Sequence, residues 1–119
     1  YALGACTDIL LDTTTTWDGA PMRYMKTHRP ELTIRTIQFS PNTYNNWHIH
    51  EAPVYIYVMS GEGCMEADSG TFPVKAGDTL LVTPGEKHVT RNTGKEPLML
   101  LCFFPVAEIT KRTQDVAAK

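Results

Sequence analysis

Turn-forming residues recur along most of the chain and leave only short stretches between them. In the central part the turns lie roughly 8 to 12 residues apart. They are Asp18-Gly19, Ser40-Pro41-Asn42, Gly61-Glu62-Gly63, Asp68-Ser69-Gly70, Lys75-Ala76-Gly77-Asp78, Pro84-Gly85 and Asn92-Thr93-Gly94. The stretches between them, such as "PVYIYVM" and "TLLVTP", are rich in β-forming residues. No window of about 11 residues has a helical period. The pattern therefore predicts an all-β sandwich or barrel.

The size and charge of the chain exclude several classes of protein. A chain of 119 residues can bury one core, so residues 1–119 are expected to form a single domain. No apolar run approaches the roughly 18 residues of a membrane span. The formal net charge is −2, without a basic stripe. We therefore expect neither a membrane nor nucleic acid as a partner.

The cysteines do not form a disulfide or zinc-ribbon pattern. Cys6, Cys64 and Cys102 are odd in number, widely spaced and without a CxxC pair. Three reduced thiols are expected, and one bridge with one thiol left over is the alternative. A cytoplasmic location is favoured, with a periplasmic one after loss of a signal peptide as the alternative.

Two histidines lie one residue apart in a stretch with strand character. In a strand, residues i and i+2 point to the same face, so His48 and His50 converge with Cα atoms about 7 Å apart. Two imidazoles at this separation can both reach a metal, although the same spacing also arises by chance in strands. His88 follows a Pro-Gly turn and starts another strand. It is either a surface residue beside the turn or a third ligand from across a barrel.

Two stretches resemble the motifs of a known family. "WHIHEAPVYIYVMSGEG" resembles the first cupin motif, and "GDTLLVTPGEKHVTRN" resembles the second. The matching residues are His48, His50, Gly61, Gly77, Pro84, Gly85, His88 and Asn92. The resemblance covers most of the chain and implies a small jelly-roll-like β-barrel of two antiparallel sheets. It implies a barrel core over about residues 30–105, an N-terminal strand arm over about 1–25, and a C-terminal tail over about 106–119. The tail is expected to form a last helical turn or to fray.

The resemblance also implies a metal site with one departure from the family pattern. It implies that His48, His50 and His88 hold one divalent transition metal, which is Fe, Zn, Ni, Mn or Cu. Cupins usually place a ligand glutamate four residues after the second histidine, and this chain has Val54 there. Glu51 adjoins His50 and is expected to point to the opposite face. The missing carboxylate indicates either an open coordination position or a site that has lost its metal.

The expected function is that of a metal-dependent enzyme. Three-histidine sites are similar to those of some non-haem iron dioxygenases in the cupin superfamily, while zinc with three histidines is the other familiar arrangement. We expect the substrate to be a small, anionic or chelating molecule. Oxidative, dioxygenase-type chemistry is favoured over a lyase or isomerase reaction, because no general base is evident. A non-catalytic module that binds a small ligand is the main alternative, and the chain is too short for a storage-type cupin.

Catalytic residues are not identified by the sequence, and Glu51, Tyr55 and Arg91 are the candidates. Arg23, Arg35 and Arg91 are candidates for binding an anionic substrate, with solvated surface positions as the alternative. His28 is expected in an exposed loop.

Two further expectations concern the faces of the sheets. Tyr55 and Tyr57 alternate with small apolar residues and are expected on an outer face that forms a homodimer. The apolar phase of "LTIRTIQF", residues 32–39, changes between its two isoleucines. This predicts a β-bulge, with Thr36 and Gln38 as candidates for the lumen.

Overall fold

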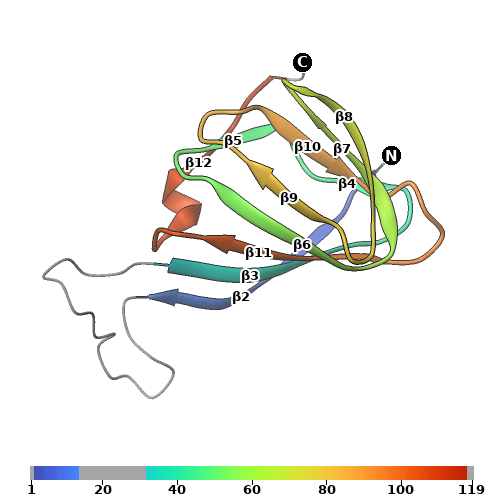
Figure 1. Cartoon of the computed structure of the whole chain (residues 1–119), viewed down its shortest axis with the longest axis horizontal. Coiled ribbons are helices and arrows are strands. Elements are labelled where there is room, and N and C mark those ends of the chain that lie inside the picture. Colours follow the sequence, from blue (N-terminus) through green and yellow to red (C-terminus); the bar gives the residue numbers. More distant parts are fainter. Residues whose placement is uncertain (1, 14–31, 118–119) are drawn as a thin grey trace, which may run out of the picture.

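Two β-sheets face each other around one apolar core in the computed structural model, which describes residues 2–13 and 32–117 (Figure 1). The first sheet contains β1 (Ala2–Leu3), β4 (Thr43–Tyr44), β5 (His48–His50), β7 (Glu62–Ala67), β8 (Gly70–Lys75), β10 (His88–Arg91) and β12 (Thr113–Asp115). The second contains β2 (Ala5–Thr13), β3 (Leu32–Phe39), β6 (Val54–Ser60), β9 (Thr79–Val82) and β11 (Leu98–Phe104). All pairs are antiparallel except β1 with β4. The prediction of an all-β barrel with two antiparallel sheets is confirmed.

The alternation of residues along the strands divides lumen from outer surface. In β6, Val54, Ile56 and Val58 are buried in the core, whereas Tyr55 and Tyr57 are exposed on the other face. This is the division that the sequence predicts. In β11 the alternate residues Leu98, Leu100, Cys102 and Phe104 are buried in the same core. The lumen is therefore closed by apolar side chains from the second sheet.

The bulge expected within β3 is absent, and this prediction was wrong. β3 pairs with β11 in unbroken register from Leu98↔Phe39 to Phe104↔Thr33. The irregularity lies instead in the neighbouring strand β2, between Ile9 and Leu11. Gln38 is exposed and Thr36 lies on the same outward face, so the lumen receives Arg35 and Ile37. Apolar residues occur on both faces of β3, because the outer face of this sheet also carries apolar side chains. On that face Ile34 pairs with Phe103.

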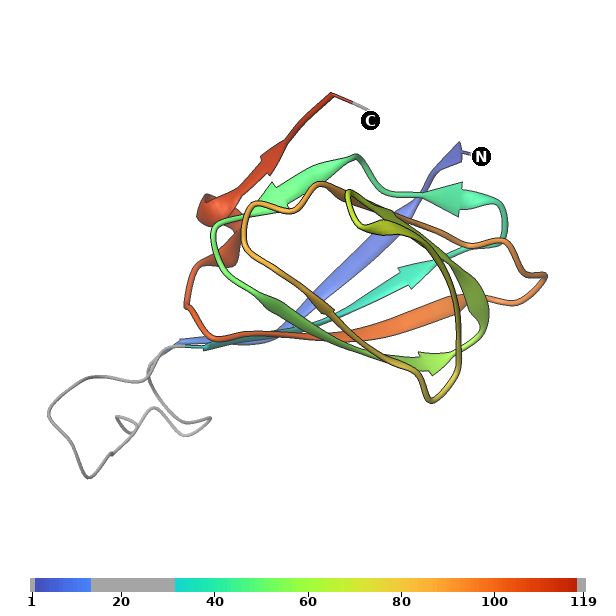
Figure 2. The ribbon, with the colours of Figure 1, turned by 45° about the horizontal axis from the view of Figure 1, so that its top comes forward.

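The C-terminal segment returns to the first sheet. After β11, a 3-10 helix η1 (Ile109–Arg112) redirects the chain, and β12 then pairs with β5 (Figures 1 and 2). Thr113 lies opposite His50, and Asp115 lies opposite His48. Ile109 is fully buried and anchors the turn in the core. Of the two expectations for the C-terminal tail, a helical turn or a frayed end, the helical turn is present. After it the chain continues as the strand β12, which the sequence did not predict.

Asn92, one of the residues in the second motif, has a structural role. Its side chain is fully buried. Its Nδ2 donates to the carbonyls of Phe39 and Glu96 at 2.9 and 2.8 Å, and its Oδ1 accepts from the Gly94 N–H at 2.9 Å. Because all its polar atoms are satisfied, Asn92 fixes the loop between β10 and β11 to the end of β3.

Arg23 and His28 lie outside the described residues, and so does the part of the expected N-terminal arm from residue 14 onward. The structure therefore does not test the expectations for these positions. Within the described ranges, β2 is exposed along Ala5 to Leu10. These ranges contain no helix long and apolar enough to cross a membrane.

Candidate metal centre

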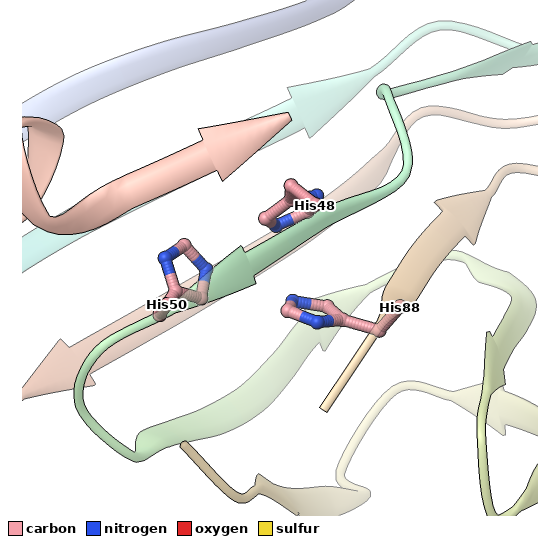
Figure 3. Close-up of side chains that lie close together, drawn as sticks. All are labelled: His48, His50 and His88. Atoms are coloured by element: carbon pink, nitrogen blue, oxygen red, sulfur yellow. The ribbon is translucent and has the colours of Figure 1, made fainter. Parts of the chain in front are cut away.

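His48, His50 and His88 come together inside the barrel. His48 and His50 project from the same side of β5, and His88 projects toward them from the adjacent strand β10 (Figure 3). The register pairs His88 with His48, so the third ring falls beside the first. Ring centroids lie 4.1 Å apart for His48 and His88, 4.7 Å for His48 and His50, and 5.2 Å for His50 and His88. All three side chains are buried, with at most 8% of the residue exposed.

A turn anchored at both ends positions His88. Gly85, whose φ of 78° suits glycine, donates its N–H to the carbonyl of His50 at 2.9 Å. The carboxylate of Glu86 accepts hydrogen bonds from Ser69 Oγ at 2.7 Å and from Thr83 Oγ1 at 3.2 Å. The Pro-Gly turn is therefore tied to the strand that carries the other two histidines.

Each histidine uses its Nδ1 atom to bond the surrounding protein. His48 Nδ1 lies 2.6 Å from the carbonyl oxygen of Asn46, and His88 Nδ1 lies 3.0 Å from that of Glu86. His50 Nδ1 lies 2.7 Å from Thr113 Oγ1, whose hydroxyl donates to the Ile109 carbonyl at 2.8 Å. The threonine oxygen therefore accepts from His50. Because all three partners are acceptors, the Nδ1 atoms carry the protons and the Nε2 lone pairs remain for a ligand.

Burial keeps the three imidazoles neutral. It lowers the pKa of His50 to about 3, with further lowering by the other two histidines, and it lowers the pKa of His88 to about 4. Burial likewise lowers the pKa of His48. Arg35 contributes to the lowering at all three rings through its positive charge. Neutral imidazole is the form that binds a metal, so protons compete weakly at neutral pH.

The donor set fits a transition-metal ion. One ligand atom from each histidine can be chosen so that all lie within 4.8 Å of one another. With bonds of about 2.1 Å, ligand nitrogens lie roughly 3.0 to 3.4 Å apart, so a small inward movement of the rings suffices. The cavity beside the rings has a free volume of about 20 Å³. That volume accepts an ion or about one water molecule.

The position of the missing glutamate is occupied by an apolar side chain of the lumen. Val54 is 1% exposed and lines the same cavity as the histidines. Among the described residues, the cavity wall contains no carboxylate: it consists of Arg35, Ile37, Asn45, His48, His50, Val54, Ile56, Met65, His88, Thr90, Leu100, Cys102 and Phe104. Burial raises the pKa of Cys102 to about 12, so this residue is a neutral thiol.

The structure does not bring the three catalytic candidates to the histidines. Glu51 is exposed just after β5. Tyr55 is 49% exposed on the outer face of β6, where it packs edge-on against Phe103. Arg91 is absent from the cavity wall and forms an ion pair with Glu66 on the neighbouring strand.

Two residues of the site lie outside the motifs. Arg35, weighed from sequence only as one of three possible anion-binding arginines, lines the cavity. Thr113 bonds His50 although 63 residues separate them. With the register of β3 known, the alternation of residues along this strand would have predicted that Arg35 faces the lumen. No local pattern identifies Thr113, because its role depends on the return of the chain to β5.

Comparison with known proteins identifies the family. The model of the family described as "Cupin domain" matches residues 35–104. An uncharacterized protein of Methanocaldococcus jannaschii is 41% identical over 46 residues, which are 39% of this chain and 37% of the relative. A protein of Thermotoga maritima named oxalate-binding protein is 31% identical over 78 residues, which are 65% of this chain and 64% of the relative. The chain thus spans less than two thirds of the length of either relative.

A solved structure supports the same conclusion for the fold. An uncharacterized conserved protein with a double-stranded β-helix domain from Klebsiella pneumoniae superposes with a TM-score of 0.74 at 17% identity. The superposition covers 97% of this chain and 86% of that protein. With the family match extending over more than half of its residues, the chain belongs to the cupin family.

Proposed function

We propose that His48, His50 and His88 bind one divalent transition metal through their Nε2 atoms. The observation that carries this proposal is that each Nδ1 faces an acceptor of the protein, in three separate arrangements. A cluster of histidines packed only as core residues has no need to bond the protein through the same ring nitrogen in all three while holding one ligand atom of each within 4.8 Å of the others. The metal is Fe, Zn, Ni, Mn or Cu, because all of these accept imidazole ligands.

Such a metal supplies either Lewis-acid polarisation or, if it is redox active, electron transfer to and from a bound small molecule. The residues of the chain hold it and exclude water. Val54, Ile56 and Leu100 contribute apolar side chains to the cavity wall. With Val54 in place of a carboxylate, the three neutral ligands leave the charge of the metal uncompensated, which favours an anionic or chelating ligand.

We infer that the protein is a metal-dependent enzyme acting on such a small molecule, with oxidative, dioxygenase-type chemistry. A lyase or isomerase needs a general base near the substrate. Among the described residues of the wall, the histidines act as ligands and Cys102 is a neutral thiol with a raised pKa. Oxidation by a redox-active metal does not need a general base among the residues of the cavity wall, and we favour it for this reason.

A non-catalytic ligand-binding role is the second candidate. The free volume of about 20 Å³ leaves little room for a substrate to react. The Thermotoga maritima relative, named oxalate-binding protein, gives this role independent support.

The outer face of the second sheet is proposed to join two copies of the chain. Tyr55, Tyr57, Leu81 and Phe103 are between 37% and 56% exposed and surround a hollow of about 500 Å³. Exposed aromatic and aliphatic side chains of this density are typical of protein interfaces.

All three cysteines are free, which fits the reducing, cytoplasmic location that the sequence favours.

Turnover distinguishes the two candidate functions. Iron-loaded and zinc-loaded protein would be supplied with a panel of small carboxylates and hydroxy acids, while dissolved oxygen and the products are followed. Oxygen consumption by the iron form alone, lost in His88→Ala, supports oxidative chemistry. Ligand binding without product in either form identifies the binding role. Product formation by the zinc form without oxygen would contradict the oxidative assignment.

A further inference from the structure

The barrel has an open side between β8 and β9. A turn from Lys75 to Asp78 connects these strands, which belong to different sheets. Within the described part of the chain, β8 pairs with β7 alone and β9 pairs with β6 alone. Because no backbone pairing joins these two edges, side chains alone separate the interior of the barrel from solvent along this side.

The side chains close this side only in part. Phe72 lies directly opposite Met65 in the register of β8 and β7, so both point toward the lumen, as does Val74 two residues further along. Met65 and Val74 are 3% and 4% exposed, whereas Phe72 is 42% exposed. The opening between the sheets therefore leaves an inward-facing aromatic ring accessible to solvent.

A groove of about 250 Å³ lies at this opening. Three strands contribute apolar side chains to its lining, namely Met65 and Ala67 of β7, Phe72 of β8, and Leu80 and Val82 of β9. An apolar cavity of about 150 Å³ is large enough to bind benzene. The groove thus has room for one substituted ring.

Met65 connects the groove to the metal centre. Among the described residues, it alone lines both the groove and the cavity that contains His48, His50 and His88. Methionine is unbranched and has three rotatable bonds, so its side chain can change rotamer without breaking a hydrogen bond. The cavity at the histidines has a free volume of only about 20 Å³. The larger part of any ligand of the metal must therefore lie elsewhere, and the groove is the adjoining space.

The lining of the groove favours an aromatic ring without a negative charge. Phe72 can pack edge-on or offset against such a ring, and the sulfur of Met65 makes favourable contacts with aromatic groups. Glu86 also lines the groove, where its carboxylate accepts a hydrogen bond from Ser69 Oγ at 2.7 Å. This carboxylate disfavours a second negative group on the ring.

We propose that the groove between β8 and β9 binds a small molecule with one aromatic ring and a chelating head. The ring packs against Phe72, and the head reaches the metal when Met65 swings aside. Met65 is then the gate between the groove and the metal centre. The role of the head rests on the metal centre proposed above, whereas binding of the ring does not.

The first test measures ring binding without a metal. 4-Fluorobenzyl alcohol, an uncharged single ring, is titrated into metal-free protein and followed by ¹⁹F NMR. Phe72→Ala removes the exposed ring of the groove. Leu10→Ala is the matched control, because it removes an exposed apolar side chain from β2, at the edge of the second sheet opposite to β9.

The parent is expected to bind 4-fluorobenzyl alcohol saturably. The dissociation constant rises about fivefold or more in Phe72→Ala, because an aromatic contact is lost, and stays within about twofold of the parent in Leu10→Ala. 4-Fluorobenzoate binds the parent about threefold or more weakly than the alcohol, because its charge lies on the ring. Absence of saturable binding to the parent, or equal dissociation constants for the parent and Phe72→Ala, would overturn the groove as a ring site. Equal affinity for the two probes would overturn the selection against negative charge.

The second test concerns the gate. 4-Fluoromandelate joins the same ring to a chelating hydroxy acid, and lactate has this head without the ring. Each is mixed with cobalt-loaded protein in a stopped-flow instrument, because the visible spectrum of Co²⁺ responds to a new ligand. Met65→Ile nearly keeps the side-chain volume but adds a β-branch that restricts rotation about χ1.

A stiffer gate slows entry and exit together. In Met65→Ile the association and dissociation rates of 4-fluoromandelate are both expected to fall about fivefold or more, with the dissociation constant within about threefold of the parent. Lactate binds the parent about tenfold or more weakly than 4-fluoromandelate, because the ring contacts are missing. An association rate in Met65→Ile within about twofold of the parent would overturn the gate. Equal affinity for lactate and 4-fluoromandelate would overturn the link between groove and metal.

Failure of the metal centre is recognised separately. If the parent takes up no Co²⁺, the metal centre and the chelating head are overturned together, while 4-fluorobenzyl alcohol still decides whether the groove binds a ring. If the parent takes up Co²⁺ but binds neither fluorinated probe, the groove and its gate are overturned and the metal centre is retained.

Discussion

Hydrogen bonding of a single ring nitrogen links the C-terminal segment to the site. His50 Nδ1 donates to Thr113 Oγ1, and this hydroxyl is itself committed to the Ile109 carbonyl. Partners of this kind fix the tautomer and orientation of a ligating histidine.

Thr113→Val is therefore expected to weaken metal binding by about tenfold or more, because the acceptor for His50 Nδ1–H is lost while the shape is kept. Thr113→Ser retains the oxygen and should remain within about threefold of the parent. Competition with a chromogenic chelator measures both. Equal affinity of Thr113→Val and the parent would show that His50 does not need this partner.

Protonation of the buried histidines makes the metal-free protein sensitive to acid. The pKa of His50 is about 3 and that of His88 about 4, against 6.5 for an exposed histidine. Below pH 6.5 the unfolded chain therefore binds protons that the folded chain does not. Stability is unaffected by these groups above pH 6.5 and is lost as the pH falls from 6.5 toward 3 or 4.

At pH 5 the expected loss in the free energy of unfolding is about 2 kcal/mol for His50, relative to pH 7.5. Urea unfolding in the presence of a chelator measures it. His50→Leu removes this contribution, so its stability should depend less on pH. A parent whose stability is the same at pH 7.5 and pH 5 would contradict the neutral, buried state of the cluster.

At the scale of elements, the hairpin between β6 and β7 depends on a glycine of the first motif. Gly61 has a φ of 85°, and a Cβ there would lie 2.4 Å from the Pro97 carbonyl oxygen. Gly77 has a similar φ of 92° but no neighbour within 4 Å of such a Cβ. An alanine at Gly61 would therefore combine backbone strain with a steric clash, whereas an alanine at Gly77 would cause backbone strain alone.

Gly61→Ala is expected to destabilise the fold by about 3 kcal/mol or more, because strain and contact combine. Gly77→Ala should cost about 1 kcal/mol, from strain alone. Chemical denaturation of both variants gives the comparison. Equal costs would show that the loop before β11 yields to the added methyl group.

Some features of these elements can be predicted from the sequence, and others cannot. The shared face of His48 and His50 follows from alternation within one strand, and the position of His88 follows from the motif that contains it. The register of β3 was misjudged because both of its faces carry apolar residues, so periodicity could not choose between them. The pairing of β12 with β5 was missed because long-range contacts determine it, with no local pattern.

For the whole molecule, the outer face of the second sheet is the feature that the barrel alone leaves unexplained. Leu81 is 56% exposed at the hollow that Tyr55 and Phe103 also line. The proposed homodimer would cover it. A typical stable interface buries about 800 Å² on each partner, which requires most of this face.

Leu81→Glu is expected to produce a monomer, because a charge would be buried without a partner. Sedimentation equilibrium measures the mass of both proteins, with Thr71→Glu, at an exposed position on β8 of the first sheet, as the control for one added negative charge. A parent that sediments as a monomer of 13.3 kDa would contradict the proposed dimer.

The central claim is that three buried histidines form a metal centre, and metal content measured by elemental mass spectrometry on untagged protein tests it most directly. His48→Ala and His88→Ala each remove one proposed ligand, while His28→Ala removes the only other histidine of the chain. The parent and His28→Ala are predicted to contain about one equivalent of a transition metal, and the other two less than about a tenth. Equal metal in all four proteins, or none in the parent after reconstitution with each candidate metal, would contradict the account.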